Sequence, residues 1–282
     1  MSNVLMSVDE LRSRLQDPLL RVADARFDLA DPGGGATAYA AAHVPGAIYA
    51  HLDRDLSDHA RRGLGRHPLP EADTFARWLA SVGYEPEQCW VVYDADSGAF
   101  AARLWWMLRT IGHRAVRVLD GGFAAWRAAE APLTAEIPSR PATSVDAAFA
   151  GDAMVEFAAI ESLRGDAAWR LVDARATPRF RGEVEPLDPV AGHVPGAINR
   201  PFAENLGADG RFKSSAALRA EWQRLIGPVD AGRVVHMCGS GVTACHNLLA
   251  MEHAGLTGSR LFPPSWSGWI SDRSRAAANG DA

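Results

Sequence analysis

The feature that most constrains the fold is an internal duplication. The hexapeptide His43-Val-Pro-Gly-Ala-Ile recurs unchanged as His193-Val-Pro-Gly-Ala-Ile, 150 positions later. Two further pairs of matching segments flank it in the same order, namely 22–26 with 171–175 and 91–98 with 234–241. Motifs repeated in one order indicate a supersecondary unit that is written twice. The 282 residues are therefore predicted to form two domains of similar fold.

Each half alternates short apolar runs with amphipathic stretches. In the first half we expect strands at 20–24, 47–49, 90–93 and 116–119, and helices at 7–16, 72–81, 99–111 and 124–129. Ser7 begins a capping box, Gly83 and Gly112 suit helix ends, and Ser214 and Gly227 bracket a helix in the second half. This alternation predicts an α/β fold, with a mainly parallel sheet and helices on both faces in each domain.

The boundary between the halves lies in a proline-containing stretch. From 131 to about 152 the chain has three prolines and few periodic apolar positions. We expect an N-terminal domain at 1–135 without an active cysteine, a linker at 136–152, and a catalytic domain at 153–282. The offset between the copies falls from 150 to 143 residues, so the first half has seven extra residues, which we place in the loop around 61–68.

Composition excludes several classes of function. A net charge of -5 and a pI near 6.0 argue against a nucleic-acid partner. The N-terminus lacks the pattern of a secretory signal, and no apolar run approaches the roughly 20 residues that span a membrane. Three cysteines are too few for a disulfide framework and show no metal-ligand spacing. We therefore expect a cytoplasmic protein without a membrane segment, metal or organic cofactor.

Cys238 is the candidate nucleophile. It follows the apolar run 234–237 and opens the sequence Gly-Ser-Gly-Val-Thr-Ala, so a strand, a glycine-rich turn and a helix should meet at the sulfur. Amide groups of such a loop and the N-terminus of a helix favour a thiolate. Cys89 and Cys245 are expected to be inert buried thiols. In the repeat, Cys238 aligns with Ala95, so only one half carries the nucleophile.

Two other loop chemistries do not fit. A Cys-x5-Arg phosphatase needs a guanidinium at the end of the loop, where this chain has Ala244. A nucleotide-binding P-loop needs Gly-Lys-Ser/Thr, but Val242 follows Gly241, and the one lysine in the chain is Lys213. The loop suits an anion on sulfur rather than a polyphosphate.

Taken with these motifs, the chain resembles the two-domain rhodanese-type sulfurtransferases almost end to end. Further matching segments are 93–94, 105–109, 119–122, 172–175 and 265–269. The resemblance implies tandem duplicated rhodanese-like domains and transfer of a sulfane sulfur from a small donor to the active cysteine. The resulting persulfide passes to cyanide or a thiol, including that of a thioredoxin-like protein. We expect a monomer or a weak dimer.

The loop resembles the branch that uses 3-mercaptopyruvate. Thiosulfate enzymes typically carry Cys-Arg-Lys-Gly-Val-Thr, whose cations suit a compact dianion, whereas Cys238 is followed by a neutral loop. By motif position, Gly239, Gly241, Val242 and Thr243 are expected to contact the substrate, and Thr243 to cap the following helix. Arg179 matches the substrate-binding arginine of the family, and a guanidinium suits bidentate contact with a carboxylate.

The family also has a proposed Ser–His–Asp relay across the cleft between its domains. By motif position Ser240 and His43 take the first two places, and Asp28 and Asp31 are both candidates for the acid. The repeat weakens the assignment of His43, because His193 holds the same position and is structural in the family.

Some positions depart from the family pattern. Asp188 stands where the mercaptopyruvate branch has a second arginine. Either another arginine substitutes, or Asp188 points away, or the substrate differs. The family segment Asp-Gly-Ser-Trp-Ser-Glu-Trp reads Pro-Pro-Ser-Trp-Ser-Gly-Trp at 263–269, which alters the wall of the site. Phe100 aligns with an aromatic residue that lines the cleft.

Three functions other than that of a mercaptopyruvate enzyme are compatible with parts of the sequence. A thiosulfate:cyanide sulfurtransferase is favoured by Asp188 and disfavoured by the neutral loop. A persulfide-carrier module would turn over small donors slowly but hold a trappable persulfide. A silent binding module is disfavoured, because Cys238 is intact.

Overall fold

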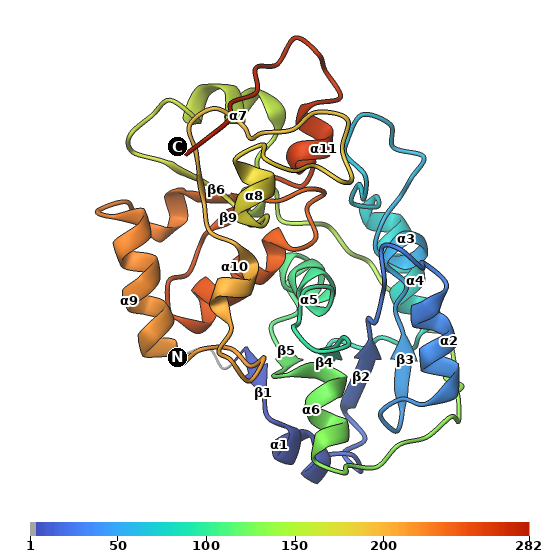
Figure 1. The fold of residues 1–282 in the computed structure, drawn as a ribbon. Helices are drawn as coiled ribbons and strands as arrows, with labels where there is room; N and C mark the ends of the chain where they lie inside the picture. The colour runs from blue at the N-terminus through green and yellow to red at the C-terminus, as the bar shows by residue number, and fades with distance from the viewer. Residues whose placement is uncertain (1–3, 282) are drawn as a thin grey trace.

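The computed structural model describes residues 4–281 and contains two parallel sheets, one in each half of the chain (Figure 1). The first sheet has the strand order β1-β5-β4-β2-β3. Its strands are β1 (Leu5–Met6), β2 (Leu20–Asp24), β3 (Ala47–Tyr49), β4 (Cys89–Tyr93) and β5 (Val116–Leu119). All four neighbouring pairs run parallel, as strand–helix alternation predicts.

The second sheet repeats this arrangement. Its order is β7-β6-β8-β9, with β6 (Arg170–Asp173), β7 (Ala197–Asn199), β8 (Val234–Met237) and β9 (Arg260–Leu261). Without β1, the first sheet has the same order, since β2, β3, β4 and β5 correspond to β6, β7, β8 and β9. The duplicated α/β fold expected from the sequence is confirmed.

Helices cover both faces of the first sheet because its side chains alternate. Val91 and Tyr93 of β4 pack with α1 (Val8–Ser13), α2 (Gly34–Ala41) and α6 (Gly122–Ala128). Trp90 and Val92 face the opposite way, toward α3 (Leu52–Asp55), α4 (Ala72–Ser81) and α5 (Ala101–Thr110). Such near-continuous apolar strands are typical of a sheet that is buried on both faces.

The second sheet is covered in the same manner. Val235 and Met237 of β8 pack with α7 (Phe157–Leu163), α8 (Thr177–Phe180) and α11 (Ser265–Trp269). Val234 and Val172 lie on the other face, against α9 (Ser215–Ile226) and α10 (Ala244–His253). Among the described residues, three 3₁₀ turns complete the order, at Gly151–Ala153, Phe202–Asn205 and Ala231–Arg233.

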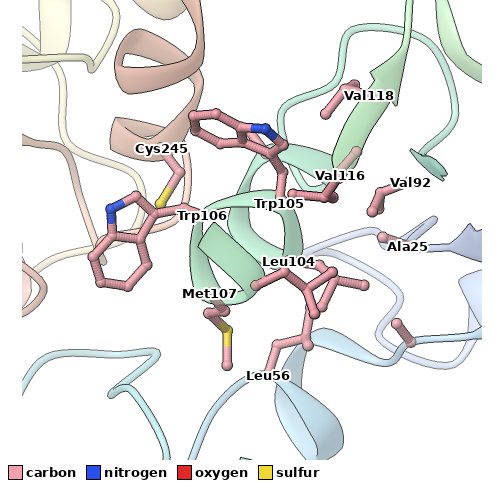
Figure 2. Close-up of a cluster of buried hydrophobic side chains, with 14 of the residues drawn as sticks. Ala25, Leu56, Val92, Leu104, Trp105, Trp106, Met107, Val116, Val118 and Cys245 are labelled. Carbon is pink, nitrogen blue, oxygen red and sulfur yellow. The ribbon is translucent and has the colours of Figure 1, made fainter. Parts of the chain in front are cut away.

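The two domains share a hydrophobic core around α5, which lies between the sheets (Figure 1). Leu104 and Met107 point from α5 toward residues of the first domain, and Trp106 lies on the side of Cys245 in α10 (Figure 2). Buried residues of both halves belong to this one cluster. Apolar packing of this kind fixes the domains relative to each other.

Local signals located most elements. The expected strands at 20–24, 47–49 and 116–119 and the helix at 72–81 have the expected bounds. Ser7 and Ser214 cap their helices, and Gly83, Gly112 and Gly227 have positive φ. The capping box is incomplete, because the Glu10 carboxylate pairs with Arg117 at 2.6 Å. The two-residue strands β1 and β9 and the glycine-rich α2 were not expected. No helix within 4–281 is long and apolar enough to cross a membrane.

Candidate active site

Cys238 lies at the carboxyl end of β8, where the chain turns into α10. The amide N–H of Gly241 points at its sulfur, with 3.2 Å between N and Sγ. Gly241 has a φ of +76°, and a Cβ there would collide with the carbonyl of Pro263. Only glycine combines this backbone conformation with so close a contact. The loop therefore directs an N–H donor at the sulfur, as the glycine spacing predicts.

The first turn of α11 forms the wall behind the cysteine. Ser265 accepts a hydrogen bond from the Cys238 amide at 3.0 Å and donates one to the Phe262 carbonyl at 3.0 Å. The amides of Trp266 and Ser267 bond the carbonyls of Cys238 and Gly239, both at 2.9 Å. Ser265 is one of two non-glycine residues in 4–281 with positive φ, 52°. These bonds hold the loop rigidly beside its wall.

A pocket of about 350 Å³ opens onto the sulfur. Of the expected substrate-contacting residues, Gly239, Val242, Thr243 and Arg179 line it, but Gly241 is not among the lining residues. The expected relay residue Ser240 and the expected aromatic residue Phe100 also line it. Both domains contribute, since Arg66 and His67 also line the pocket. Thr243 occupies the N-cap position of α10, but its side chain makes no capping hydrogen bond, so that expectation is wrong.

Ser240 forms its side-chain contact with His67 rather than with His43. The His67 Nδ1 lies 2.8 Å from the Ser240 Oγ, and Asp53 Oδ1 lies 3.4 Å from the opposite ring nitrogen. Burial, followed by the positive charges of Arg103 and Arg66, lowers the pKa of His67 to about 3. The neutral ring carries one proton, which the Asp53 carboxylate favours on Nε2. Nδ1 is then left to accept the Ser240 hydroxyl proton.

The expected pairing of Ser240 with His43 is wrong. His43 is fully buried in the first domain, where its ring nitrogens lie 2.7 Å from the Tyr39 carbonyl and 3.1 Å from that of Glu136. His193 makes the equivalent contact, 2.8 Å from the Phe180 carbonyl. Each imidazole also stacks on the aromatic ring of the same neighbour. The repeated histidine is therefore a structural element in both copies.

The sequence-based candidates for the acid of the relay, Asp28 and Asp31, are also wrong. The Asp28 carboxylate accepts the Ala30 amide at 2.8 Å, within its own loop, and neither Asp28 nor Asp31 is among the residues that contact His67. Asp53 takes that position from α3. One signal could have located His67: the seven extra residues of the first copy fall in the loop around 61–68, which has no counterpart in the second.

Arg103 joins this loop to the cysteine loop. Its guanidinium is fully buried and donates to the carbonyls of Gly241, His67 and Leu56 at 2.9, 3.2 and 3.3 Å. A guanidinium holds its N–H donors in a fixed planar arrangement, so its hydrogen bonds restrain the backbone carbonyls that accept them. One side chain of the first domain thereby holds both loops that meet at Ser240.

Arg179 and Asp188 lie together at the pocket. Arg179 Nη2 is 2.7 Å from Glu185 Oε1 and 3.2 Å from Asp188 Oδ2. Burial opposes ionisation of Glu185, but hydrogen bonds from Arg179 and from two amides hold its pKa below the ordinary value. Arg181 instead faces outward and pairs with Asp281 at 2.6 Å.

A family model described as the rhodanese-like domain matches residues 7–129 and again 157–272. The chain belongs to the rhodanese family. The expected resemblance is confirmed, and the second rhodanese domain is the one that carries Cys238 in its loop.

Relatives cover nearly the whole tandem rhodanese chain. A probable 3-mercaptopyruvate sulfurtransferase of Pseudomonas aeruginosa is 46% identical over 283 residues, 98% of each protein. A putative thiosulfate sulfurtransferase of Mycobacterium tuberculosis is 40% identical over 285 residues, 99% of this chain and 98% of the relative. Both donors therefore occur in the names of similar proteins.

Solved structures show the same tandem rhodanese architecture. The 3-mercaptopyruvate sulfurtransferase of Leishmania major superposes with a TM-score of 0.83 at 32% identity, covering 94% of this chain and 74% of that one. SseA of Escherichia coli superposes with a TM-score of 0.80 at 32% identity, covering 94% and 99%.

The other two cysteines have different surroundings in the rhodanese domains. Cys245 is fully buried in α10, and burial raises the pKa of its thiol to about 12, so it stays protonated. Cys89 is half-buried, and its sulfur lies 3.4 Å from Nη1 of Arg14. The expectation of a buried thiol holds for Cys245 but not fully for Cys89.

Proposed function

We propose that this rhodanese transfers the sulfur of 3-mercaptopyruvate through a persulfide on Cys238 to a thiol or cyanide. The observation that carries the proposal is the contact between Ser240 and His67, 2.8 Å across the domain boundary beside the cysteine loop. A thiol donor must have a proton moved from sulfur to carbon, whereas thiosulfate needs no such transfer. An imidazole that is hydrogen-bonded to a hydroxyl is placed to pass such a proton on, although the low pKa of His67 makes it a weak base.

The reaction balances without a cofactor. The Cys238 thiolate attacks the sulfur of the donor, an S–S bond forms, and the C–S bond breaks with its electron pair on carbon. Pyruvate leaves as its enolate, and the proton from the donor thiol goes to that carbon through Ser240 and His67. The Gly241 amide, 3.2 Å from Sγ, stabilises the anionic sulfur. An acceptor thiolate or cyanide then removes the outer sulfur.

Thiosulfate is the second candidate donor. Two guanidinium groups, those of Arg66 and Arg179, line the pocket and would attract an anion. The putative thiosulfate sulfurtransferase among the relatives adds weight to this alternative. The neutral pair Gly239 and Ser240 beside the sulfur weighs against a compact dianion.

The test compares the two donors on one preparation. We expect a higher kcat/KM for 3-mercaptopyruvate and, in the absence of acceptor, a species heavier by about 32 Da, one sulfur atom, on the Cys238 peptide. Cys238→Ser should abolish both signals, and Cys89→Ser, which changes a half-buried thiol that does not line the pocket, should retain them. Turnover by Cys238→Ser would refute the nucleophile, and a preference for thiosulfate would favour the second candidate. A trappable persulfide with slow turnover of both donors would indicate a carrier module.

We also propose that the enzyme works in the cytosol as a monomer or weak dimer. The three free cysteines support a reducing compartment, because a thiolate survives there without forming a disulfide. Cell fractionation and light scattering test these two points.

A further inference from the structure

Asp188 joins two arginines that come from different domains. Its Oδ1 lies 2.6 Å from Nη1 of Arg66, in the long loop of the first domain, and its Oδ2 lies 3.2 Å from Nη2 of Arg179, in α8. The Asp188 side chain is only 3% exposed. The carboxylate therefore points at two cations rather than at an incoming anion, and its charge does not repel the substrate.

Each arginine has one further amino group directed at the cysteine loop. Nη2 of Arg66 lies 3.2 Å, and Nη1 of Arg179 lies 3.6 Å, from the position that a Cβ on Gly239 would take. Within 4–281, the hydrogen bonds of Arg66 and Arg179 to carboxylates use Nη1 of the former, and Nε and Nη2 of the latter. Two donors thus converge beside the residue that follows Cys238. That arrangement suits the two oxygens of one carboxylate.

The loop that carries Arg66 is seated on α11 by close backbone contact. The Arg66 amide donates to Ser267 Oγ at 2.9 Å. A Cβ on Gly268 would lie only 3.1 Å from the Gly65 amide nitrogen, and a Cβ on Gly65, which has a φ of +95°, would lie 2.5 Å from the Pro264 carbonyl oxygen. Glycine at 65 and 268 is therefore what allows the loop to come this close. The departures from the family pattern at 263–269 and at Asp188 therefore both contact the loop that carries Arg66.

We propose that Arg66 is the second carboxylate-binding arginine of the active site, and that Asp188 positions it with Arg179 as one cradle. The proposal rests on the proposed function, because the ligand is the carboxylate of the α-keto acid donor. The cradle pairs two guanidinium groups with Asp188 and Glu185, so its formal charge is balanced. It therefore recognises a monoanion through directed hydrogen bonds rather than a dianion through charge. The domain without the active cysteine supplies half of the specificity.

The test uses two electrophiles that differ only in the carboxylate. 3-Bromopyruvate and its ethyl ester both alkylate a thiolate through the same carbon, and the ester has no charge. Arg66→Ala should lower the rate of Cys238 alkylation by bromopyruvate about 10- to 100-fold, the effect of one charge-assisted hydrogen bond, and change the rate with the ester less than about twofold. Arg62→Ala is the matched control, because it removes an exposed arginine of the same loop. It should leave both rates unchanged.

A double variant tests the part played by Asp188. If Asp188 positions Arg66, then Arg66→Ala should cost clearly less in an Asp188→Ala background than in the wild-type protein. Additive effects would overturn the positioning role. Arg66→Lys should recover only part of the bromopyruvate rate, because an ammonium group lacks the second directed donor.

Other outcomes separate this proposal from the proposed function. Equal losses with both reagents, or no loss with bromopyruvate, would overturn the role of Arg66 even if Cys238 is the nucleophile. If neither reagent modifies wild-type Cys238, the assignment of Cys238 as the nucleophile is wrong. Calorimetric titration with pyruvate then tests whether Arg66 and Arg179 bind a carboxylate. Pyruvate binding that Arg66→Ala weakens about tenfold or more would support the cradle. Wild-type protein that does not bind pyruvate would overturn it.

Discussion

His67 and Ser240 are 173 residues apart in sequence and belong to different domains, yet 2.8 Å separates the imidazole Nδ1 from the hydroxyl oxygen. The first domain has no active cysteine, but it supplies the histidine, Asp53 and Arg103 that surround the cysteine loop. A simple division into one active and one inactive half therefore does not describe the site. Both copies are needed to build it.

His67→Ala should lower kcat with 3-mercaptopyruvate about 100-fold or more, which is the usual contribution of a positioned proton carrier. The loss with thiosulfate should be smaller, because its S–S cleavage moves no proton to carbon. His43→Ala is the control, since it removes a buried imidazole whose ring nitrogens lie beside two backbone carbonyls, away from Ser240. We expect it to keep kcat while lowering the free energy of unfolding by about 1–3 kcal/mol. Steady-state kinetics and urea unfolding check both variants, and equal kcat losses with both donors for His67→Ala would contradict the relay.

Arg179→Ala should raise KM for 3-mercaptopyruvate about tenfold or more, because a charge-assisted hydrogen bond to the carboxylate is lost. Removal of the outer sulfur by cyanide does not need this group, so the cyanide half-reaction of a preloaded enzyme should change little. Stopped-flow measurement of each half-reaction separates the two steps. Arg181→Ala serves as the control, since Arg181 pairs with Asp281 at the surface. An unchanged KM in Arg179→Ala would show that Arg179 does not bind the carboxylate of the donor.

Gly241→Ala should abolish transfer and destabilise the fold, because a methyl group would collide with the carbonyl of Pro263 and displace the amide from the sulfur. Gly210→Ala is a matched control: its φ is also +76°, and no atom lies within 4 Å of the added Cβ. The control should lose only about 1 kcal/mol, the cost of a left-handed backbone for alanine. Thermal unfolding and turnover measure the difference. Similar losses in both variants would show that the contact with Pro263 is unimportant.

Stability should decrease in mild acid. Burial lowers the pKa of His67 and His236 to about 3, and that of His246 to about 4. In the unfolded chain each titrates near its ordinary value of 6.5. Below pH 6.5 the unfolded chain therefore binds more protons than the native one. The contribution of these neutral histidines to the free energy of unfolding is complete above pH 6.5. It falls as the pH drops toward 4 for His246 and toward 3 for His67 and His236.

The urea midpoint measured between pH 7.5 and 4.5 checks this expectation. The free energy of unfolding should fall by at most about 1.4 kcal/mol per pH unit for each histidine. His236→Gln should flatten the curve, while His59→Gln should not, since His59 is half exposed. A midpoint that is constant from pH 7 to 5 would contradict the argument.

The fold followed largely from local patterns. Strands at 20–24 and 116–119 are short apolar runs between turn signals, and the hexapeptides at His43 and His193 required the two halves to share a topology. Cys238 was also accessible from sequence, because an apolar strand, two glycines and a helix start are all neighbours along the chain. Such features depend on backbone conformation and side-chain periodicity within a few residues.

The residues that surround the sulfur were decided by tertiary structure. His43 stood in a repeated motif and was mistaken for the relay base, while His67 and Arg66 lie in a loop with no regular structure of its own. Their positions depend on how α5 packs between the two sheets and how closely Gly65 approaches α11. The sequence by itself determined a duplicated α/β chain with one reactive cysteine. Only packing between the domains decided which histidine, acid and arginine reach it, because those contacts join residues that are far apart along the chain.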